Sequence, residues 1–341
     1  PDSYCFDRVL DYSLNMFLAK KVRKTAVILI FSCFSILGWS SEQIKWSLSP
    51  SFGLINGKIG EYLYSSMNDR LLSYLEFNEN TLPYISLGAE ISHNNSNFTA
   101  DVQYKIPAQC GLMTDSDWKI KNIKTNYGIF NNYTDYKNFN FNLGYGFCFN
   151  LGSRFYIQPQ IQLMYRHYSF YTDIGYGWYG NNCAWNEPEA TYYPKLSHIN
   201  LIMQNYSLFI GIDFEYVMNK VKFKFNAATS PLMINYAIDF HADDNKNTNN
   251  IHSTYTKQIS SFFAYKTGVT LEYKLSNKSS LTTGFDCLMT LVTKGPTGID
   301  YNEPEEKFGL LENPEEWKAI GQNTGNKIFE FGFNAGIRID L

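Results

Sequence analysis

Large apolar and polar residues alternate one by one along much of this chain. In the stretch NFNFNLGYGFCFNL, residues 138–151, every second side chain is Phe, Leu or Tyr, and the positions between them hold Asn, Gly or Cys. A period of two indicates a β-strand whose two faces meet different surroundings. The alternation continues for longer than the strands of soluble proteins usually run, which favours a strand that crosses a membrane.

The same alternation recurs along the chain and gives ten strand candidates. Seven are clear, at 138–151, 155–167, 206–216, 221–227, 265–275, 281–293 and 329–341, and three are weaker, at 46–54, 72–77 and 84–91. Short polar turns are predicted at 78–83, 150–154, 217–220 and 275–280, and long connections near 57–70, 95–136, 171–199, 241–259 and 294–326. Short turns on one side and long loops on the other are typical of outer-membrane β-barrels.

These patterns predict an all-β fold, a ten-stranded antiparallel transmembrane β-barrel with long extracellular loops. An even number of strands suits both chain ends lying on the periplasmic side. A soluble β-sandwich is the alternative, since its strands also alternate, but they are shorter, about 5–6 residues. The strand length and the unequal connections favour the barrel.

The N-terminal segment has the pattern of a secretory signal. A basic stretch, Lys20–Lys24, is followed by an apolar run, Ala26–Leu37, and then by small Gly and Ser residues. That run is short for a membrane-spanning helix, which needs about 20 residues. We therefore expect residues 1–41 to be an N-terminal extension and signal peptide, and residues 42–341 to form a barrel in the outer membrane.

Composition narrows the class of partners. Aromatic residues make up 17% of the chain and charged residues 18%, and the net charge is −3. So small a charge gives no pull toward nucleic acid, and the many aromatic residues suit a barrel wall in lipid. The cysteines beyond the signal fit no metal-binding spacing, and Cys110 and Cys183 could form a disulfide if their loops meet.

Two short motifs stand where predicted strands meet long loops. Asp115 and Asp117 are two residues apart in TDSDW, and Asp239 and His241 are two residues apart in IDFH. In extended backbone this spacing turns both side chains of a pair to one face. TDSDW follows the third strand and IDFH ends the seventh, so both motifs meet the extracellular rim, where they can face each other across a small barrel.

Two carboxylates opposite an Asp–His pair can hydrolyse a bond without a covalent intermediate. The carboxylate fixes the imidazole tautomer, the other ring nitrogen takes a proton from water, and an opposing carboxylate shares that water. Two close aspartates also raise the pKa of one of them. The alternatives are a solvated loop start and a calcium ligand. The sequence has no regular ligand spacing for calcium or zinc, so we expect neither a metal nor an organic cofactor.

Three motifs resemble the omptin family, outer-membrane aspartyl-type endoproteases built on ten-stranded barrels. GLMTDSDW at 111–118 is similar to the family segment M-x-D-x-D-W, DFHADD at 239–244 to D-x-H-x-D, and NGKIGEYLY at 56–64 to the first-loop segment G-K-x-x-E. Their order and spacing fit the family, as does RHYSF at 166–170 on the fifth strand. The resemblance covers residues 43–341.

The resemblance implies a catalytic role for four side chains. Asp115 and His241 would activate the attacking water, and Asp239 would orient His241 and stabilise its charge. Asp117 would support Asp115 and the oxyanion. The implied activity is that of an aspartic-type endopeptidase that cleaves extracellular polypeptides.

The resemblance also implies a substrate-binding role for Glu61 and Met113. Glu61 would line the pocket for a basic residue before the scissile bond, and Met113 would border the cleft. In the family a second acidic residue lies two positions before the D-x-H aspartate. Here that position is Ala237, so a preference for dibasic sites is not implied. Glu187 and Glu189, in a long loop, could restore attraction for a basic substrate or could simply be solvated.

Some family members need lipopolysaccharide, but the corresponding stretch here, with Leu163, Tyr165 and His167, matches poorly, so dependence on this lipid is not predicted. The other expected partners are polypeptide substrates and outer-membrane lipid, with the barrel as a monomer. Two other functions suit the same scaffold, a non-proteolytic adhesin or receptor and a passive porin. Retention of all four polar site residues argues against the adhesin, and the narrow interior of ten strands argues against the porin.

Overall fold

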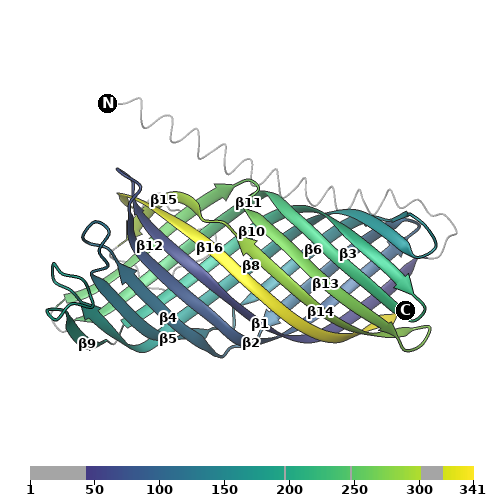
Figure 1. The fold of residues 1–341 in the computed structure, drawn as a ribbon, viewed down its shortest axis with the longest axis horizontal. Coiled ribbons are helices and arrows are strands. Elements are labelled where there is room, and N and C mark those ends of the chain that lie inside the picture. Colours follow the sequence, from purple (N-terminus) through teal and green to yellow (C-terminus); the bar gives the residue numbers. More distant parts are fainter. Residues whose placement is uncertain (1–43, 196, 246–247, 301–317) are drawn as a thin grey trace, which may run out of the picture. The chain divides into compact units, whose positions relative to one another are not determined.

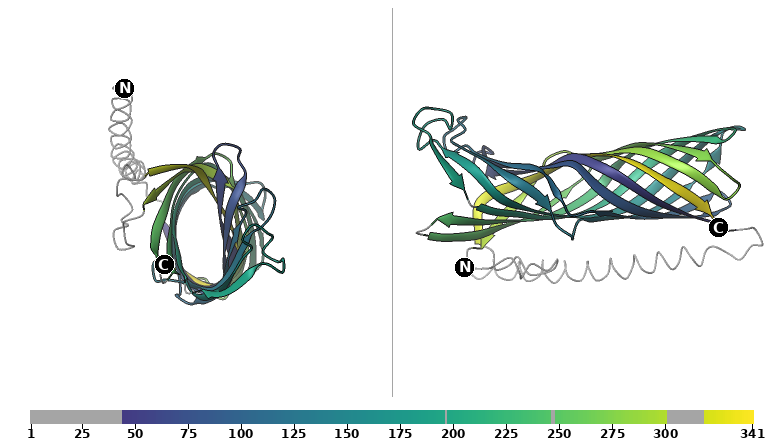
Figure 2. Two further views of the ribbon diagram at one scale, coloured as in Figure 1. Left: turned by 90° about the vertical axis from the view of Figure 1, so that its left-hand side faces the viewer. Right: turned by 90° about the horizontal axis from the view of Figure 1, so that it is seen from below.

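The computed structural model describes residues 44–195, 197–245, 248–300 and 318–341. In this part of the chain β1 (Lys45–Ser65) pairs on one side with β2 (Leu71–His93) and on the other with β16 (Lys318–Asp340). The antiparallel sheet therefore closes into a ring, which Figure 2 shows end-on in its left view. The predicted signal peptide within residues 1–41 lies outside the described residues. Among the described residues, no helix is long and apolar enough to cross a membrane.

Sixteen strand segments make up the ten tilted strands of this ring (Figure 1). Besides β1, β2 and β16, three ring strands are unbroken, namely β8 (Phe155–Tyr179), β10 (Ser197–Met218) and β11 (Val221–Asn245). Four ring strands are each interrupted once: β3 (Ser96–Lys105) with β4 (Gln109–Asp117), β5 (Asn126–Thr134) with β6 (Phe139–Phe147), β12 (Thr248–Ser260) with β13 (Ala264–Lys274), and β14 (Ser279–Thr290) with β15 (Thr293–Asp300). The short strands β7 (Phe149–Asn150) and β9 (Thr191–Lys195) each pair with β8. The expected all-β, ten-stranded antiparallel barrel is confirmed.

Two strand assignments from the sequence are wrong. The predicted strands at 72–77 and 84–91 are a single strand, β2, and no turn lies at 78–83. The missing third strand is formed by β3 and β4, inside the predicted connection 95–136. The cause is the polar middle of β2, where Glu79 points inward to an ion pair and Thr81 has a positive φ of 54°. These residues break the alternation without ending the strand.

The outer wall carries an apolar band near the start of β1 and the end of β16. On β1 the exposed side chains of this band are Trp46, Leu48, Phe52 and Leu54. Beyond Leu54 the pattern changes, because the exposed Lys58 pairs with Glu76 of β2 at 2.7 Å. Lipid suits the apolar band and water suits the ion pair, so the barrel continues past the membrane as a polar extension. Glu61 and everything farther along β1 belong to that extension.

The lumen is crossed by a buried ion cluster. Lys105 on β3 binds Glu79 of β2 and Glu330 of β16, each at 2.6 Å. The other Glu330 oxygen accepts hydrogen bonds from Arg166 and, at 2.8 Å, from the Tyr168 hydroxyl on β8. The Lys105 ammonium also lies 4.6 Å from the centre of the Tyr168 ring. Each charge in this cluster has an opposite partner, which buried charges require.

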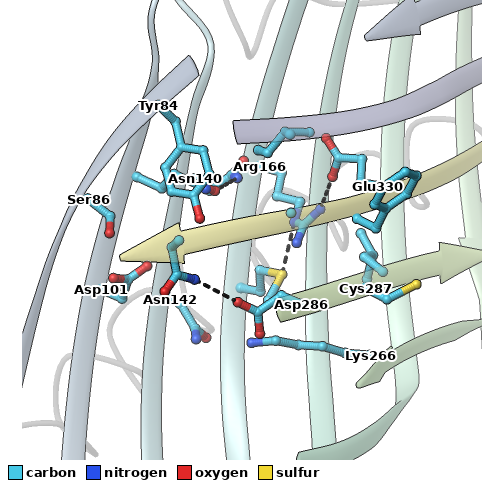
Figure 3. A pocket seen from close by; sticks show the side chains of 17 residues that line it. Tyr84, Ser86, Asp101, Asn140, Asn142, Arg166, Lys266, Asp286, Cys287 and Glu330 are labelled. Atoms are coloured by element: carbon cyan, nitrogen blue, oxygen red, sulfur yellow. Dashed lines mark hydrogen bonds and ion pairs between the residues drawn. The ribbon is translucent and has the colours of Figure 1, made fainter. Parts of the chain in front are cut away.

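Next to this cluster, the lumen contains a cavity of about 260 Å³. Figure 3 shows Arg166 and Glu330 on one side of it and Asp101, Lys266 and Asp286 on the other. Charged and amide side chains therefore line the inside of the barrel while apolar side chains cover the outside. This inversion relative to a soluble protein is what a membrane barrel requires.

We predict that Glu330→Gln lowers the free energy of unfolding by about 3–5 kcal/mol, because it leaves Lys105 and Arg166 buried with too little negative charge. The matched change Lys58→Met breaks an exposed ion pair and should cost no more than about 1 kcal/mol. Urea unfolding in detergent or lipid, followed by tryptophan fluorescence, measures both. Equal losses in the two variants would show that the lumenal cluster does not stabilise the barrel.

Candidate active site

Three inward positions on neighbouring strands lie in one row at the polar extension. Glu61 on β1 is the register partner of Leu75 on β2, and Leu75 is in turn the register partner of Asp115 on β4. Side chains directly opposite each other on paired strands lie about 5 Å apart. Sheet pairing therefore brings Glu61 and Asp115, which are far apart in the sequence, to the same level of the barrel.

The two aspartates of β4 share one face. Asp115 and Asp117 line the same small cleft, as their spacing predicts. The Asn126 side-chain amide on β5 donates a hydrogen bond of 3.0 Å to Asp117 Oδ2. The Asp117 carbonyl also accepts the Thr125 backbone N–H at 2.8 Å. Asp117 is thus held at the end of its strand from the β5 side.

Asp239 and His241 form a hydrogen-bonded pair on β11. His241 Nε2 binds Asp239 Oδ2, and both side chains turn toward the inside of the barrel. Asp239 is nearly fully buried, whereas 21% of the His241 side chain remains exposed. The pair is therefore shielded on the carboxylate side and open on the imidazole side, which is the arrangement in which a histidine can reach a bound molecule.

The charges of both walls act on the imidazole. Burial would lower the pKa of His241, but the charge of Asp239 and its hydrogen bond, followed by the charges of Asp115 and Glu61, raise that pKa to about 9. Asp115 is on β4 and Asp239 is on β11, so carboxylates from separate parts of the ring act on one imidazole. The structure thus brings together four of the six predicted site residues.

Glu61 is a buried carboxylate that faces this group. Burial raises the pKa of Glu61 well above its usual range, and the nearby charge of Asp239 raises it further, while His241 opposes both. Its Oε2 atom finds no hydrogen-bond partner among the described residues, and neither does Asp239 Oδ1. Two unsatisfied oxygen acceptors at one end of a barrel suit a bound group with several N–H donors.

A neutral amide cluster lies beside Glu61. Ala237 is buried on β11, and two residues before it Asn235 donates a hydrogen bond of 3.2 Å to Asn326. Asn326 is the register partner of Glu61, and the Gln258 amide also donates to it. Glu61 therefore stands beside hydrogen-bonding groups that carry no charge.

Met113 lies below the cleft, and the acidic loop residues lie at the surface. Met113 lies two residues before Asp115 and is fully buried between Phe77 and Phe130, its register partners, so it forms part of the floor below the cleft. Glu187 and Glu189 are exposed, as expected for a solvated loop.

Cys110 and Cys183, which could have paired if their loops met, are both free. The thiol of Cys110 donates to the Asn132 carbonyl, and the thiol of Cys183 donates to the Gly180 carbonyl. Among the described residues, no group of three or more His, Cys, Asp or Glu side chains is placed to hold a metal ion.

Asn126 and Asn326 were missed by the reading of the sequence. Asn126 fell inside the supposed long connection 95–136, and its role follows only from the pairing of β4 with β5. Asn326 fell inside the connection 294–326 and meets Glu61 only because β16 closes the ring with β1. Both residues could have been identified only from the strand register.

The closed antiparallel sheet, apolar outside and polar inside, defines the protein as a membrane β-barrel with a carboxylate and histidine site at one end. The chain belongs to the Omptin family, whose family model matches residues 42–312. This confirms the resemblance drawn from the motifs and places the barrel in the outer membrane.

One solved structure agrees with that fold. The structure is similar to that of the outer membrane protease OmpT from Escherichia coli, with a TM-score of 0.73 and 15% sequence identity, covering 87% of this chain and 97% of that one. The translocator domain of the autotransporter NalP from Neisseria meningitidis is less similar, with a TM-score of 0.28 and 9% identity over 93% and 96% of the two chains. A comparison with curated protein sequences gave no match.

We predict that the His241 charge makes stability depend on pH. Because its pKa rises from an ordinary 6.5 to about 9 on folding, the charged ring stabilises the barrel fully below pH 6.5, and this contribution is lost as the pH rises through 9. Asp239→Asn removes the main charge that raises the pKa, so the loss should be smaller and should be complete at lower pH. Urea midpoints between pH 6 and 10 measure it. Identical pH profiles for the two proteins would contradict this assignment.

Proposed function

We propose that this protein is an outer-membrane endopeptidase that hydrolyses peptide bonds of extracellular polypeptides with an activated water molecule. The observation that carries the proposal is the convergence of Asp115, Asp239 and Glu61 on the single imidazole of His241. Membership of the Omptin family supports it, and so does the similarity to a structure described as an outer membrane protease.

In the proposed reaction, Asp239 binds His241 through Nε2, and Nδ1 is the nitrogen that acts on the water. Asp115 accepts a hydrogen bond from the same water, so the water oxygen is turned toward the substrate carbonyl carbon. The oxygen–carbon bond forms as His241 takes the proton. His241 then passes that proton to the leaving nitrogen as the carbon–nitrogen bond breaks. Asp117, held by Asn126, keeps Asp115 in place and adds negative charge to the cleft.

A basic substrate side chain would also prepare the base. At neutral pH the imidazole is protonated, since its pKa is about 9, and a protonated ring cannot accept another proton. A Lys or Arg side chain bound by Glu61 adds positive charge near His241, which lowers the pKa of the ring. Binding and activation of the catalytic base would then be one event.

Glu61 is the proposed recognition group for the residue before the scissile bond. Its Oε2 atom has no partner among the described residues, so it can accept hydrogen bonds from an ammonium or guanidinium group. Ala237 adds no charge, and the neighbouring amides are neutral. We therefore propose selectivity for a single basic residue and not for a dibasic pair.

The site is proposed to face the extracellular side. The start of β1, near Ser47, and the end of β16, near Asp340, lie at one edge of the barrel, beside the apolar band. Glu61 and Asp115 lie at the opposite edge, on the polar extension. Outer-membrane barrels keep their short turns on the periplasmic side and their longer connections outside.

We predict that Asp115→Ala and His241→Ala each lower the cleavage rate by about 10²–10⁴-fold, because each removes a group that acts on the water proton. Purified protein in lipid, with a library of peptides that contain Lys or Arg, provides the assay. Asp340→Ala, at the opposite edge, is the matched control and should cleave normally. Unchanged cleavage by the first two variants, with the barrel folded, would overturn the proposed mechanism. Loss of activity on chelation, restored by a metal ion, would do the same.

We predict that Glu61→Gln lowers kcat/KM about 10–100-fold for peptides with Lys or Arg before the scissile bond, since a charged hydrogen bond contributes about 1.5–3 kcal/mol. Peptides with a neutral residue there should change much less. The ratio of kcat/KM between the two sets is the measurement. A uniform loss across both sets would remove Glu61 from substrate recognition.

A further inference from the structure

The wall on the far side of Asp115 from Glu61 lacks side chains at two successive positions. Asp115 is the register partner of Gly128 on β5, and Gly128 is the register partner of Gly177 on β8. Paired strands lie about 4.8 Å apart, so Gly128 and Gly177 extend the row about 10 Å beyond Asp115. Glu61 lies about the same distance away on the other side.

These glycines form the floor of the small cleft that contains the two aspartates. We call it the glycine cleft, and its remaining lining residues are Asn126, Tyr127, Gly128, Phe130, Gly177 and Tyr179. Its volume is about 10 Å³, roughly the room that one water molecule needs. Away from the aspartates and Asn126, the Phe130 ring and glycine backbone form its walls. So small a cleft accepts only a small group.

Phe130 sets the size of the glycine cleft. Its ring is almost fully buried, and a Cβ atom added to Gly128 would lie only 2.7 Å from that ring. A Cβ atom on Gly175, the register partner of Phe130, would lie 2.3 Å from the same ring. Glycines on both neighbouring positions therefore make room for the ring, and the ring in turn closes the lower end of the cleft.

An extended substrate would use both ends of this row. Successive side chains of an extended chain point in opposite directions. If the residue before the scissile bond turns toward Glu61, the residue after it turns the other way, past Asp115 and toward Gly128. The row Glu61, Leu75, Asp115, Gly128, Gly177 thus has a binding position on each side of the reacting water.

We propose that the glycine cleft binds the side chain that follows the scissile bond, and that it selects small residues such as Gly, Ala and Ser. The inference rests on the proposed protease function and deepens it, because it names the second determinant of the cleaved sequence. Glu61 selects by charge on one side of the bond, and Phe130 selects by size on the other.

The test uses peptides that share one Lys before the cleaved bond and differ only in the next residue, which is Gly, Ala, Leu or Phe. Wild-type protein in lipid should cleave the Gly and Ala peptides at least 10-fold faster, in kcat/KM, than the Leu and Phe peptides. Phe130→Ala enlarges the cleft and should raise the Leu-to-Ala ratio at least 10-fold, since differences of a few methylene groups are worth about 10–200-fold in an apolar pocket.

Phe170→Ala is the matched control, because Phe170 is an equally buried ring that packs against Phe77, outside the cleft lining. It should leave the Leu-to-Ala ratio unchanged. If Phe130→Ala does not fold, Gly177→Val offers the opposite test: it fills the cleft, so cleavage before Ala should fall at least 10-fold relative to cleavage before Gly.

The outcomes separate the two proposals. If wild-type protein cleaves none of the peptides and no member of a wider library, the protease function itself fails. If wild-type protein cleaves them with equal efficiency, or if Phe130→Ala and Phe170→Ala change the ratio alike, the glycine cleft is not the subsite. An unchanged Ala-to-Gly ratio in Gly177→Val would overturn the assignment in the same way.

Discussion

The pairing of β1 with β16 is the constraint on which the site depends. It closes the ring, and it places Glu61 between Asn326 on one side and Leu75 on the other. A slip of one residue would turn Glu61 outward, since side chains alternate between the two faces of a strand. A one-residue slip of β16 would likewise turn Glu330 toward lipid and away from Lys105. The membrane therefore enforces the register that the polar extension needs.

Below the site, the interior is filled in two layers. The apolar side chains of Phe77, Met113 and Phe130 lie directly under the cleft, and the ion cluster around Glu330 lies deeper in the lumen. The apolar layer keeps water from reaching the site from below, so charges there are weakly screened. That is why three carboxylates can move the pKa of one histidine so far. The packed lumen also argues against a passive pore.

The fold class and the chemical motifs could be predicted from the sequence, because lipid and water impose a period of two and because the spacing in TDSDW and IDFH fixes which side chains share a face. The continuity of β2 could not be predicted, since Glu79 and Thr81 look like a turn when the ion pair of Glu79 with Lys105 is unknown. Asn126 and Asn326 were also missed, because each acts through a neighbouring strand. The local sequence pattern shows which face of a strand each side chain occupies. Strand register determines which side chains on adjacent strands are neighbours, and the site is formed by such neighbours.

In the proposed protease, the alanine at position 237 affects catalysis as well as recognition. A carboxylate there, two residues from Asp239 and on the same face, would raise the pKa of His241 further and would make Glu61 harder to ionise. The neutral amides of Asn235 and Asn326 have neither effect. In the proposed mechanism the charge that attracts a basic residue is also the charge that keeps the histidine protonated. Selectivity for basic residues and the strength of the proposed base would therefore change together. Ala237 would weaken the preference for basic residues and would make the histidine easier to neutralise.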